Sequence, residues 1–581
     1  MVRTFFDFQL KIWKDREDNI LELNKKATLT ILILVISIFL IYIFNIGAYD
    51  LWSPDEPRYA EIAREAAVDG HWIIPHLNNR IYYEKPPTYF NLIGLSGILA
   101  GEFSVTAVRM PGIIISVLLL LSLAYFVLKK DGLKTAVLST IILATTVNFF
   151  WLAMKINLDI PLVFCTTLAA LILFKNHSDF KNNKLTTIFA FFLMGLGAVV
   201  KSPISILPLI ILTVYLVINK KAKKLKEIPW LASLFFMVLP ALIWLFFAYQ
   251  KAGYSYFETT VLDQLAGYST GSQGHPQPFY YYLINFPAAA LPWSFFVVPA
   301  LYYYKKLKNE RNTLLDFSVV SFLVIFIVFS MIGSKRNVYL LQLYPFFAII
   351  VGWFFKQHLN GKIKEKKSII IPMLILIILF LTVGIYIYLN GEALITEELD
   401  FQLNKNSSFF TLYQSLYFLF TGAGIVFLLS IFTKKRYMFG SLVMFSLILI
   451  IMLKTLFLPT LNTVKSERYL AEDLAAAYNE STEVGLWGSL NNDSGFVFYN
   501  GIYYDKIFSE AEKAREFLNS EGNQILIINE AEKLYDNFKQ NDYQGFKVNK
   551  YRVGSDDMLL LIEKPLLTNR ALDSDNRMAE E

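Results

Sequence analysis

Long hydrophobic runs alternate with short polar segments along most of this chain. Runs such as residues 27–46, 113–128, 369–389 and 437–453 approach or reach the ~20 residues that a helix needs to cross the hydrocarbon core of a bilayer. They lack the two-residue alternation that is typical of membrane-spanning barrels. The pattern therefore predicts an all-α polytopic membrane protein.

The composition agrees with this prediction. The 581 residues are 55% hydrophobic and 16% aromatic, and only 18% are charged, which is too apolar for a set of soluble domains. The formal net charge is +6, but the basic residues lie in short clusters between hydrophobic runs, so they indicate topology and not nucleic-acid binding. The single cysteine, Cys165, cannot form an internal disulfide.

The basic clusters assign the two sides of the membrane, because cytoplasmic loops are enriched in lysine and arginine. From Lys129 onward, two hydrophobic runs separate consecutive clusters, which is the number needed to cross and return. Before Lys129 there are three runs where two are needed, so residues 88–100, a short run with two glycines, are predicted not to cross completely. This gives about thirteen transmembrane helices, a cytoplasmic segment at 1–26 with no signal peptide, and an external C-terminus.

Two polar stretches, residues 53–59 (SPDEPRY) and 82–87 (YYEKPP), lie on the predicted outer face. Charged groups this dense beside a membrane segment need partners, a substrate or water. Residues 59–68 have helix-forming composition, which predicts a short amphipathic helix along the membrane surface with Asp55 at its start. Asp55 is then either a site residue or a helix cap, and Glu84 either a site residue or an ion-pair partner of Lys85.

Later polar breaks fall on the same face. They contain Lys155, Asn157 and Asp159; Lys201-Ser202-Pro203; a loop at 254–279 that includes His275; and Lys335 with Arg336. Taken singly, the first break is either a solvated turn or part of a site, and Lys335 and Arg336 either extend to the interface from a helix end or contact phosphate or lipid. Their convergence on one face favours an active site there.

Three motifs carry a resemblance to a known family. SPDEPRYAEIARE (53–65), GHWIIPHLN (70–78) and YYEKPP (82–87) resemble the membrane glycosyltransferases related to bacterial aminoarabinose transferase, which are kin to the protein O-mannosyltransferases. KSP (201–203), HPQPFY (275–280), LPW (291–293), SKR (334–336) and YP (344–345) are similar to the family's later landmarks. The resemblance implies a GT-C fold in the bacterial inner membrane, with the site on the periplasmic side.

The resemblance also implies a function. The donor would be a sugar on a polyprenyl phosphate such as undecaprenyl phosphate, and the acceptor would be lipid A or a related cell-envelope glycolipid. Asp55 and Glu84 would be the catalytic carboxylates. The implied substrate- and phosphate-binding residues are Lys85, Arg58, Lys201, Tyr344, Asp159 and Tyr82. These residue types suit the chemistry, because cations stabilise a departing phosphate and a carboxylate accepts a hydroxyl proton.

A divalent metal, zinc or magnesium/manganese, is a further implication of the resemblance. Glu84 and His275 would supply oxygen and nitrogen donors, and His275 is otherwise an interfacial hydrogen-bonding residue. The closer aminoarabinose transferases carry a glutamate-histidine pair followed by an arginine in this loop, whereas residues 258–264 (ETTVLDQ) contain neither histidine nor arginine. The sugar and the acceptor therefore stay open.

The chain changes character after the last hydrophobic run. Residues 27–458 are predicted to be the transmembrane catalytic domain, 459–565 a small periplasmic α/β domain, and 566–581 a disordered tail. Within the α/β domain, helices are predicted at 471–478 and 511–518, and strands at 483–487, 496–499, 525–529 and 558–562.

Two alternative functions remain. One is an enzyme like the protein O-mannosyltransferases, with a hydroxyl acceptor. The other is a transporter or flippase for a lipid-linked sugar, since polar residues within a helical bundle also mark transport paths. The clustering of polar elements at one face, instead of near the midplane, argues against the transporter.

Overall fold

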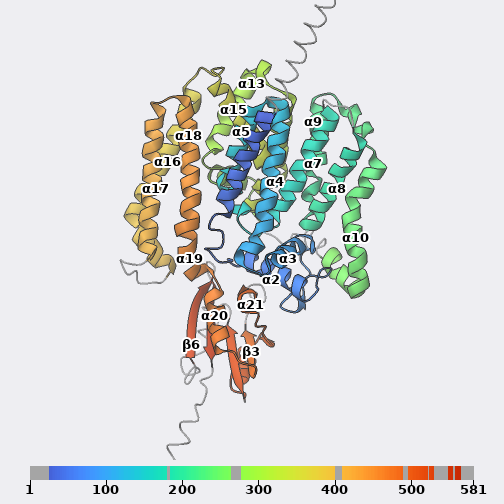
Figure 1. The fold of residues 1–581 in the computed structure, drawn as a ribbon, viewed down its shortest axis with the longest axis vertical. Coiled ribbons are helices and arrows are strands. Elements are labelled where there is room, and N and C mark those ends of the chain that lie inside the picture. The colour runs from blue at the N-terminus through green and yellow to red at the C-terminus, as the bar shows by residue number, and fades with distance from the viewer. Residues whose placement is uncertain are drawn as a thin grey trace, which may run out of the picture.

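The computed structural model describes residues 25–178, 183–263, 276–399, 408–487, 495–520, 522–528, 547–553 and 557–563. A helical bundle forms the body of the molecule, and a small sheet with short helices lies at one end of it (Figure 1). Residues 1–24 of the predicted cytoplasmic segment and the whole predicted tail at 566–581 lie outside the described residues.

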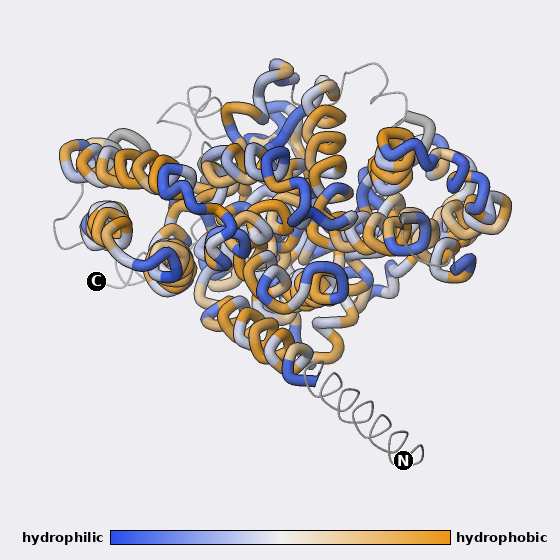
Figure 2. The backbone as a smooth tube through the Cα atoms, turned by 90° about the horizontal axis from the view of Figure 1, so that it is seen from above, coloured by the Kyte–Doolittle hydropathy of each residue, from blue (hydrophilic) through white to orange (hydrophobic). Residues whose placement is uncertain are grey.

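Nine helices among the described residues are long and apolar enough to cross a membrane. They are Lys25–Ile43, α4 (Val105–Asp131), α7 (Asp159–Ser178), α10 (Trp230–Phe257), α14 (Thr313–Met331), α15 (Tyr344–Leu359) with the helical turns that precede it from Asn337, α16 (Lys367–Leu399), α17 (Ser408–Ile431), and α18 (Lys435–Met452) with its continuation to Lys465. Hydrophobic residues predominate along the bundle helices, including those at its periphery (Figure 2). On the peripheral helix α10, for example, Leu231 and Phe246 are exposed, as expected for a helix that faces lipid.

Two helix pairs are bent at short breaks. The first is α5 (Leu133–Ala144) with α6 (Val147–Ala153), bent by 70°, and the second is α12 (Tyr281–Ala289) with the segment leading into α13 (Val297–Lys306), bent by 114°. Shorter apolar helices are α3 (Thr88–Ala100), α8 (Lys184–Val200) and α9 (Leu207–Ile218). The predicted thirteen spans are reached only if both bent pairs, α8 and α9 are counted, so that number stays a prediction.

The predicted helix after the first polar stretch is α2 (Asp55–Val68), and it is more enclosed than a helix lying on a membrane surface. Helix α3 packs closely on it, since a Cβ atom added at Gly94 would lie 2.8 Å from the Ala63 carbonyl oxygen. Arg64 donates to the hydroxyl of Tyr503, so the C-terminal segment covers another face. A two-stranded hairpin, β1 (His76–Leu77) and β2 (Arg80–Ile81), follows α2.

The C-terminal sheet has the order β4-β3-β5-β7-β6. Its strands are β3 (Thr482–Trp487), β4 (Lys506–Phe508), β5 (Asn523–Ile528), β6 (Lys547–Val553) and β7 (Asp557–Glu563). Strand β3 is parallel to β4 and β5, and β7 is antiparallel to β5 and β6. The short helices are α19 (Leu458–Lys465), α20 (Arg468–Ala477), α21 (Gly495–Asn500) and α22 (Ala511–Leu518).

The strand predicted at 496–499 is wrong, because these residues form α21. Both edges of β3 are already paired, and α21 instead buries Phe496 and Val497 in the core beside α20. The side chain of Asn500 donates to the Ala471 carbonyl, which fixes α21 on α20.

Helix continues from Lys435 to Lys465, so the predicted domain boundary at 458 falls within a continuous helix. The domain limits therefore stay predictions.

A buried ion pair joins α4 to the start of α2. Arg109 is fully buried and binds both carboxylate oxygens of Glu56, at 3.0 Å each. Its remaining donors bind the carbonyls of Ile46, Tyr49 and Asp50 at 2.7–3.0 Å. The guanidinium group thus fixes the end of the first helix, the following turn and α2 relative to one another.

We expect Arg109→Met to destabilise the protein severely. The substitution leaves the Glu56 carboxylate buried without its cation, which typically costs about 3–5 kcal/mol. Thermal unfolding of the purified protein in detergent measures the effect. Lys506→Met, which removes an exposed ion pair with Glu483, is the control and should change stability by less than about 1 kcal/mol. Equal midpoints for the two variants would contradict the importance of the buried pair.

Candidate active site

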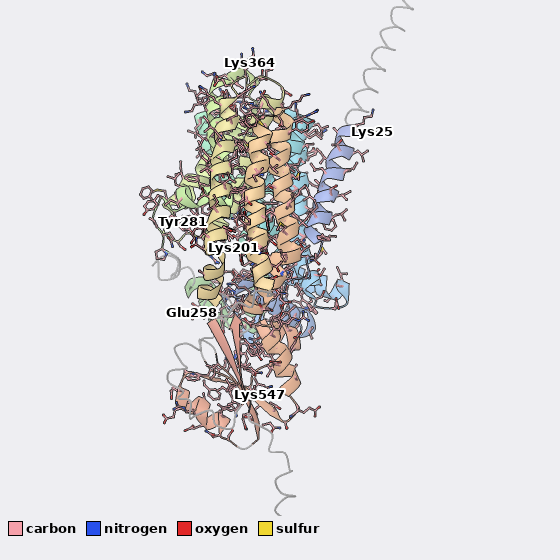
Figure 3. The ribbon with its side chains drawn as sticks, turned by 90° about the vertical axis from the view of Figure 1, so that its left-hand side faces the viewer. Lys25, Lys201, Glu258, Tyr281, Lys364 and Lys547 are labelled. Atoms are coloured by element: carbon pink, nitrogen blue, oxygen red, sulfur yellow. The ribbon has the colours of Figure 1, made fainter. Side chains whose placement is uncertain are left out.

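A polar cavity of about 300 Å³ lies where the start of α2 meets the turn after α6 and the segment before α15. Its lining residues are Trp52, Ser53, Pro54, Asp55, Glu56, Tyr59, Lys85, Trp151, Leu152, Lys155, Ile156, Asn157, Leu158, Asp159, Lys201, Arg336, Val338 and Tyr339. Lys201 lies between the level of Tyr281 and that of Glu258, towards the end of the bundle that carries the C-terminal sheet (Figure 3). The cavity therefore gathers most of the polar breaks that the sequence placed on one face.

Asp55 lies in this cavity between two arginines. Its Oδ1 atom is 2.8 Å from Arg58 and its Oδ2 atom is 3.8 Å from Arg336. The residue is the first of α2, and no side-chain capping hydrogen bond forms at this helix start. Asp55 thus directs its carboxylate to cations and does not cap the helix.

Glu84 adjoins the cavity through Arg58. One carboxylate oxygen accepts a hydrogen bond from Tyr82 at 3.0 Å and lies 3.8 Å from Arg58. The Arg58 guanidinium therefore lies between the two predicted catalytic carboxylates. In the part of the chain that the structure describes, no carboxylate lies within ion-pair distance of Lys85, so the alternative of a Glu84–Lys85 pair is not supported.

A second acid-base pair forms another part of the wall. Lys201 follows α8, and its ammonium group lies 2.5 Å from the carboxylate of Asp159 at the start of α7. The side chain of Asn157 accepts from the backbone N–H groups of Asp159 and Ile160, at 3.1 and 3.0 Å, which fixes this helix start. These contacts give the polar break at 155–159 more order than a solvated turn.

Aromatic rings line the same cavity. The Lys155 ammonium lies 4.2 Å from the ring centre of Trp151 and 5.1 Å from that of Trp52, a cation–π arrangement. Burial lowers the pKa of Lys155, and the nearby Glu56 carboxylate opposes this effect. The flat faces of tryptophan and tyrosine offer apolar surface of the kind that packs against a sugar ring.

The structure thus brings Asp55, Lys85, Asp159 and Lys201 into one cavity wall. Arg58, Tyr82 and Glu84 form an adjoining network behind it. Tyr344 is not brought to the cavity: it is fully buried at the start of α15, where its hydroxyl accepts a hydrogen bond from Asn148 at 3.2 Å. The predicted direct contact of Tyr344 with substrate is therefore not supported.

Several cavity residues were not predicted from the sequence. Trp52, Trp151 and Tyr339 belong to a residue class that is common at membrane interfaces, so their presence in the sequence carries no signal of function. The sequence did carry a signal for Arg336, because this residue belongs to the SKR motif, but a position at the interface beside a helix end explained its charge equally well.

The structure describes only one of the two predicted metal ligands, Glu84. His275 lies outside the described residues. Among the residues that are described, no group of three or more histidine, cysteine, aspartate or glutamate side chains is close enough to hold a metal ion. Glu84 already binds Tyr82 and faces Arg58. A metal held by Glu84 and His275 stays a prediction.

The charges of the wall determine what the cavity can bind. Lys85, Lys155, Lys201 and Arg336 supply positive charge, and Asp55 and Asp159 supply carboxylates. Clustered lysine and arginine side chains bind phosphate oxygens through charge-assisted hydrogen bonds. The cavity can therefore hold an anionic phosphate beside a carboxylate that orients or deprotonates a hydroxyl group.

Part of this chain is similar to known proteins. Residues 27–254 match the family model "Dolichyl-phosphate-mannose-protein mannosyltransferase". A protein of Aquifex aeolicus described as uncharacterized is 25% identical over 359 residues, which cover 61% of this chain and 69% of the relative. The "Undecaprenyl phosphate-alpha-4-amino-4-deoxy-L-arabinose arabinosyl transferase" of Pectobacterium atrosepticum is 30% identical over 334 residues, 55% of this chain and 58% of the relative.

A solved structure shares the fold. The crystal structure of ArnT from Cupriavidus metallidurans bound to undecaprenyl phosphate superimposes with a TM-score of 0.70 at 16% sequence identity, covering 92% of this chain and 98% of that chain. The predicted resemblance to this group of membrane glycosyltransferases and the predicted helical membrane fold of GT-C type are therefore confirmed, whereas the number of spans and the C-terminal domain stay predictions.

Helix α2, which carries Asp55, buries Glu61 and Glu65 in addition to Glu56. Glu61 accepts two hydrogen bonds from Arg64, at 2.7 and 2.8 Å, and Glu65 accepts the backbone N–H of Asn79, at 3.2 Å for the nearer oxygen. Burial, and then the neighbouring Glu61 carboxylate, raise the pKa of Glu65 above its ordinary value of 4.5. The ionised form of Glu65 is therefore unfavourable in the folded protein.

This pKa shift predicts a pH-dependent effect of Glu65→Gln. Because the folded-state pKa is raised, the contribution of the protonated side chain to stability is complete at acidic pH and is lost as pH rises through the raised pKa. Glutamine keeps an acceptor for Asn79 and cannot ionise. We expect the variant to unfold at a higher temperature than the wild type at pH 9, and we expect this difference to shrink at pH 5. Each unit by which the pKa is raised corresponds to about 1.4 kcal/mol of stability.

Thermal scans in detergent at the two pH values check this prediction. Glu472→Gln, at an exposed position on α20, is the matched control and should show no such pH dependence. A shift for Glu65→Gln that is equal at both pH values would contradict it.

Proposed function

We propose that this protein is an integral membrane glycosyltransferase that moves a sugar from a polyprenyl-phosphate donor to an extracytoplasmic acceptor, lipid A or a related cell-envelope glycolipid. The observation that carries the proposal is the cavity, which Lys85 lines together with Asp55 and Asp159 and where, among the described residues, no carboxylate forms an ion pair with Lys85. The named relative and the solved structure with undecaprenyl phosphate support the same donor class.

The chemistry follows from these side chains. When the acceptor oxygen attacks the anomeric carbon, the bond from that carbon to the phosphate oxygen breaks, and the electron pair stays on the lipid phosphate. Lys85, with Lys201 and Arg336 nearby, would stabilise the charge that develops there. If the acceptor is a hydroxyl group, its proton passes to a carboxylate, for which Asp55 is placed in the cavity. If it is already an anionic phosphate, no base is needed and Asp55 would orient the reactants.

The orientation of the chain in the membrane is part of the proposal. Lys25 and Lys364, from two of the predicted cytoplasmic clusters, lie at the end of the bundle opposite to Lys547 of the C-terminal sheet (Figure 3). The excess of cytoplasmic lysine and arginine would then place Lys201, the cavity and the C-terminal sheet towards the periplasmic face of the bacterial inner membrane.

A protein hydroxyl acceptor is the second candidate. The match of residues 27–254 to the protein mannosyltransferase family favours it, and a hydroxyl acceptor would use a carboxylate as base. Mass spectrometry of lipid A and of glycoproteins from cells with and without the protein separates the two candidates. A lipid A that is unchanged beside altered glycoproteins would favour the second.

Asp55→Asn and Glu84→Gln should each abolish sugar transfer, with a loss of at least about 100-fold, which is the range for removal of a general acid–base group. Asp55→Asn removes the carboxylate that lies in the cavity. Glu84→Gln removes the negative charge beside Arg58. Transfer from an undecaprenyl-phosphate sugar is measured with the purified protein in detergent, where no sealed compartment exists. Size-exclusion profiles and unfolding midpoints like those of the wild type show that the variants are folded.

Two results would refute this assignment. Transfer retained by both variants would remove the two carboxylates from the mechanism. A wild-type protein that forms no covalent product in detergent, yet moves the lipid-linked sugar across sealed vesicles, would be a transporter.

Metal dependence is tested separately. If Glu84 and His275 hold a divalent ion, treatment with EDTA should lower transfer at least about 10-fold, the loss expected when a metal site is disturbed. Added Zn²⁺, Mg²⁺ or Mn²⁺ should restore the activity, and His275→Ala should behave like the chelated enzyme. Full activity after EDTA treatment that removes all bound metal would exclude a required ion.

A further inference from the structure

We propose that Asn462, Glu467 and Tyr499 of the C-terminal segment are positioning residues for the active site, because they hold the backbone of residues 50–53 that leads to Asp55. Their effect on catalysis rests on the proposed function, whereas their effect on the local structure does not. Two segments far apart in the sequence meet at this point: α20 and α21 lie directly against the end of the bundle that carries α2 and α3 (Figure 1).

Asn462 makes the central contact. Its side-chain oxygen accepts a hydrogen bond from the backbone N–H of Asp50 at 3.0 Å and another from the indole N–H of Trp52 at 3.2 Å. Asn462 is buried, and Trp52 lines the cavity. A single oxygen atom on α19 thus fixes both the backbone before the catalytic motif and one aromatic side chain of the cavity wall.

The neighbouring residues have partners from the same segment. The hydroxyl of Tyr499, on α21, accepts from the backbone N–H of Leu51 at 2.8 Å. The Ser53 hydroxyl, which lines the cavity, donates to the carboxylate of Glu467. Each of residues 50–53 therefore has a backbone or side-chain atom bound to a group more than 400 positions further along the chain.

The other side of this backbone is held by the bundle. Arg109 binds the carbonyl oxygens of Tyr49 and Asp50 at 2.8 and 2.7 Å. The carbonyls of Tyr49 and Asp50 are thus held from α4, and the N–H groups of Asp50 and Leu51 are held from the C-terminal segment. Only Pro54 separates Ser53 from Asp55, and a proline ring restricts the backbone, so a displacement of residues 50–53 would be passed on to Asp55.

Catalysis is sensitive to such displacements. A misplacement of about 1 Å, even when caused by a residue remote from the chemistry, can lower a rate about 100-fold. A purely structural role for these contacts would instead lower stability throughout the protein and leave the activity of the folded fraction unchanged. The two roles therefore predict different measurements.

Hydrogen–deuterium exchange tests the local structure without reference to activity. Tyr499→Phe and Asn462→Leu should each increase exchange in peptides covering residues 50–52, because each removes an acceptor of a backbone N–H group there. Lys506→Ala, at an exposed position on β4 of the same sheet, is the matched control and should leave these peptides unchanged. Unaltered exchange at 50–52 in both variants would overturn the proposal.

Steady-state kinetics tests the effect on the site. For the folded fraction of Tyr499→Phe and Asn462→Leu, kcat should fall at least about 10-fold, with the KM for the lipid-phosphate sugar within about 2-fold of the wild type. Asn462→Asp should recover most of kcat, because a carboxylate oxygen can accept both N–H groups. Unchanged kcat, or a loss of kcat that Asn462→Asp shares in full, would make these residues merely structural.

The outcome also separates this proposal from the proposed function. If the wild-type protein transfers no sugar, the transferase assignment fails, and the exchange measurement alone then decides whether the C-terminal segment holds residues 50–52. If the wild type is active and exchange rises without any change in kcat, the positioning role fails and the transferase assignment stands.

Discussion

Burial of the Glu56–Arg109 pair is the constraint on which the arrangement of the site depends. A buried guanidinium group is tolerated only when its donors are satisfied, and here it binds both carboxylate oxygens and three backbone carbonyls. Glu56 in turn accepts the backbone N–H of Ile156 at 3.1 Å. One ion pair therefore joins α4, the start of α2 and the turn after α6, and the last two of these supply residues of the cavity wall.

The same pair explains why two adjacent acids have different roles. Successive residues of a helix point about 100° apart, so Glu56 can face the interior while Asp55 faces the cavity. Glu56 is buried against Arg109, whereas Asp55 lies between Arg58 and Arg336. The inward carboxylate thereby orients the outward one, and a change at Glu56 would disturb Asp55 without touching a substrate.

Much of this could be predicted from sequence, because charge beside a hydrophobic run is conspicuous. The runs predicted the helical bundle, and the polar breaks predicted the convergence of Asp55, Lys85, Asp159 and Lys201. Trp52 and Trp151 could not be predicted, since aromatic residues are common in and beside membrane segments whatever their role. Tyr344 belongs to a motif but packs against Asn148 inside the bundle. Arg109 is a lone arginine near the start of an apolar helix, and this placement alone indicates that it needs a buried partner.

The backbone between the first helix and α2 also shows why neither part of the molecule builds the site alone. Residues 50–52 belong to no helix or strand, so their buried N–H groups need tertiary partners. The N–H groups of Asp50 and Leu51 find them in the C-terminal segment, and that of Trp52 lies 3.4 Å from Glu56. Irregular backbone at the edge of a membrane bundle is stable only where protein or water satisfies it. The C-terminal segment meets that requirement at the residues that lead into the SPDEPRY motif (53–59), which links its folding directly to the geometry of the cavity.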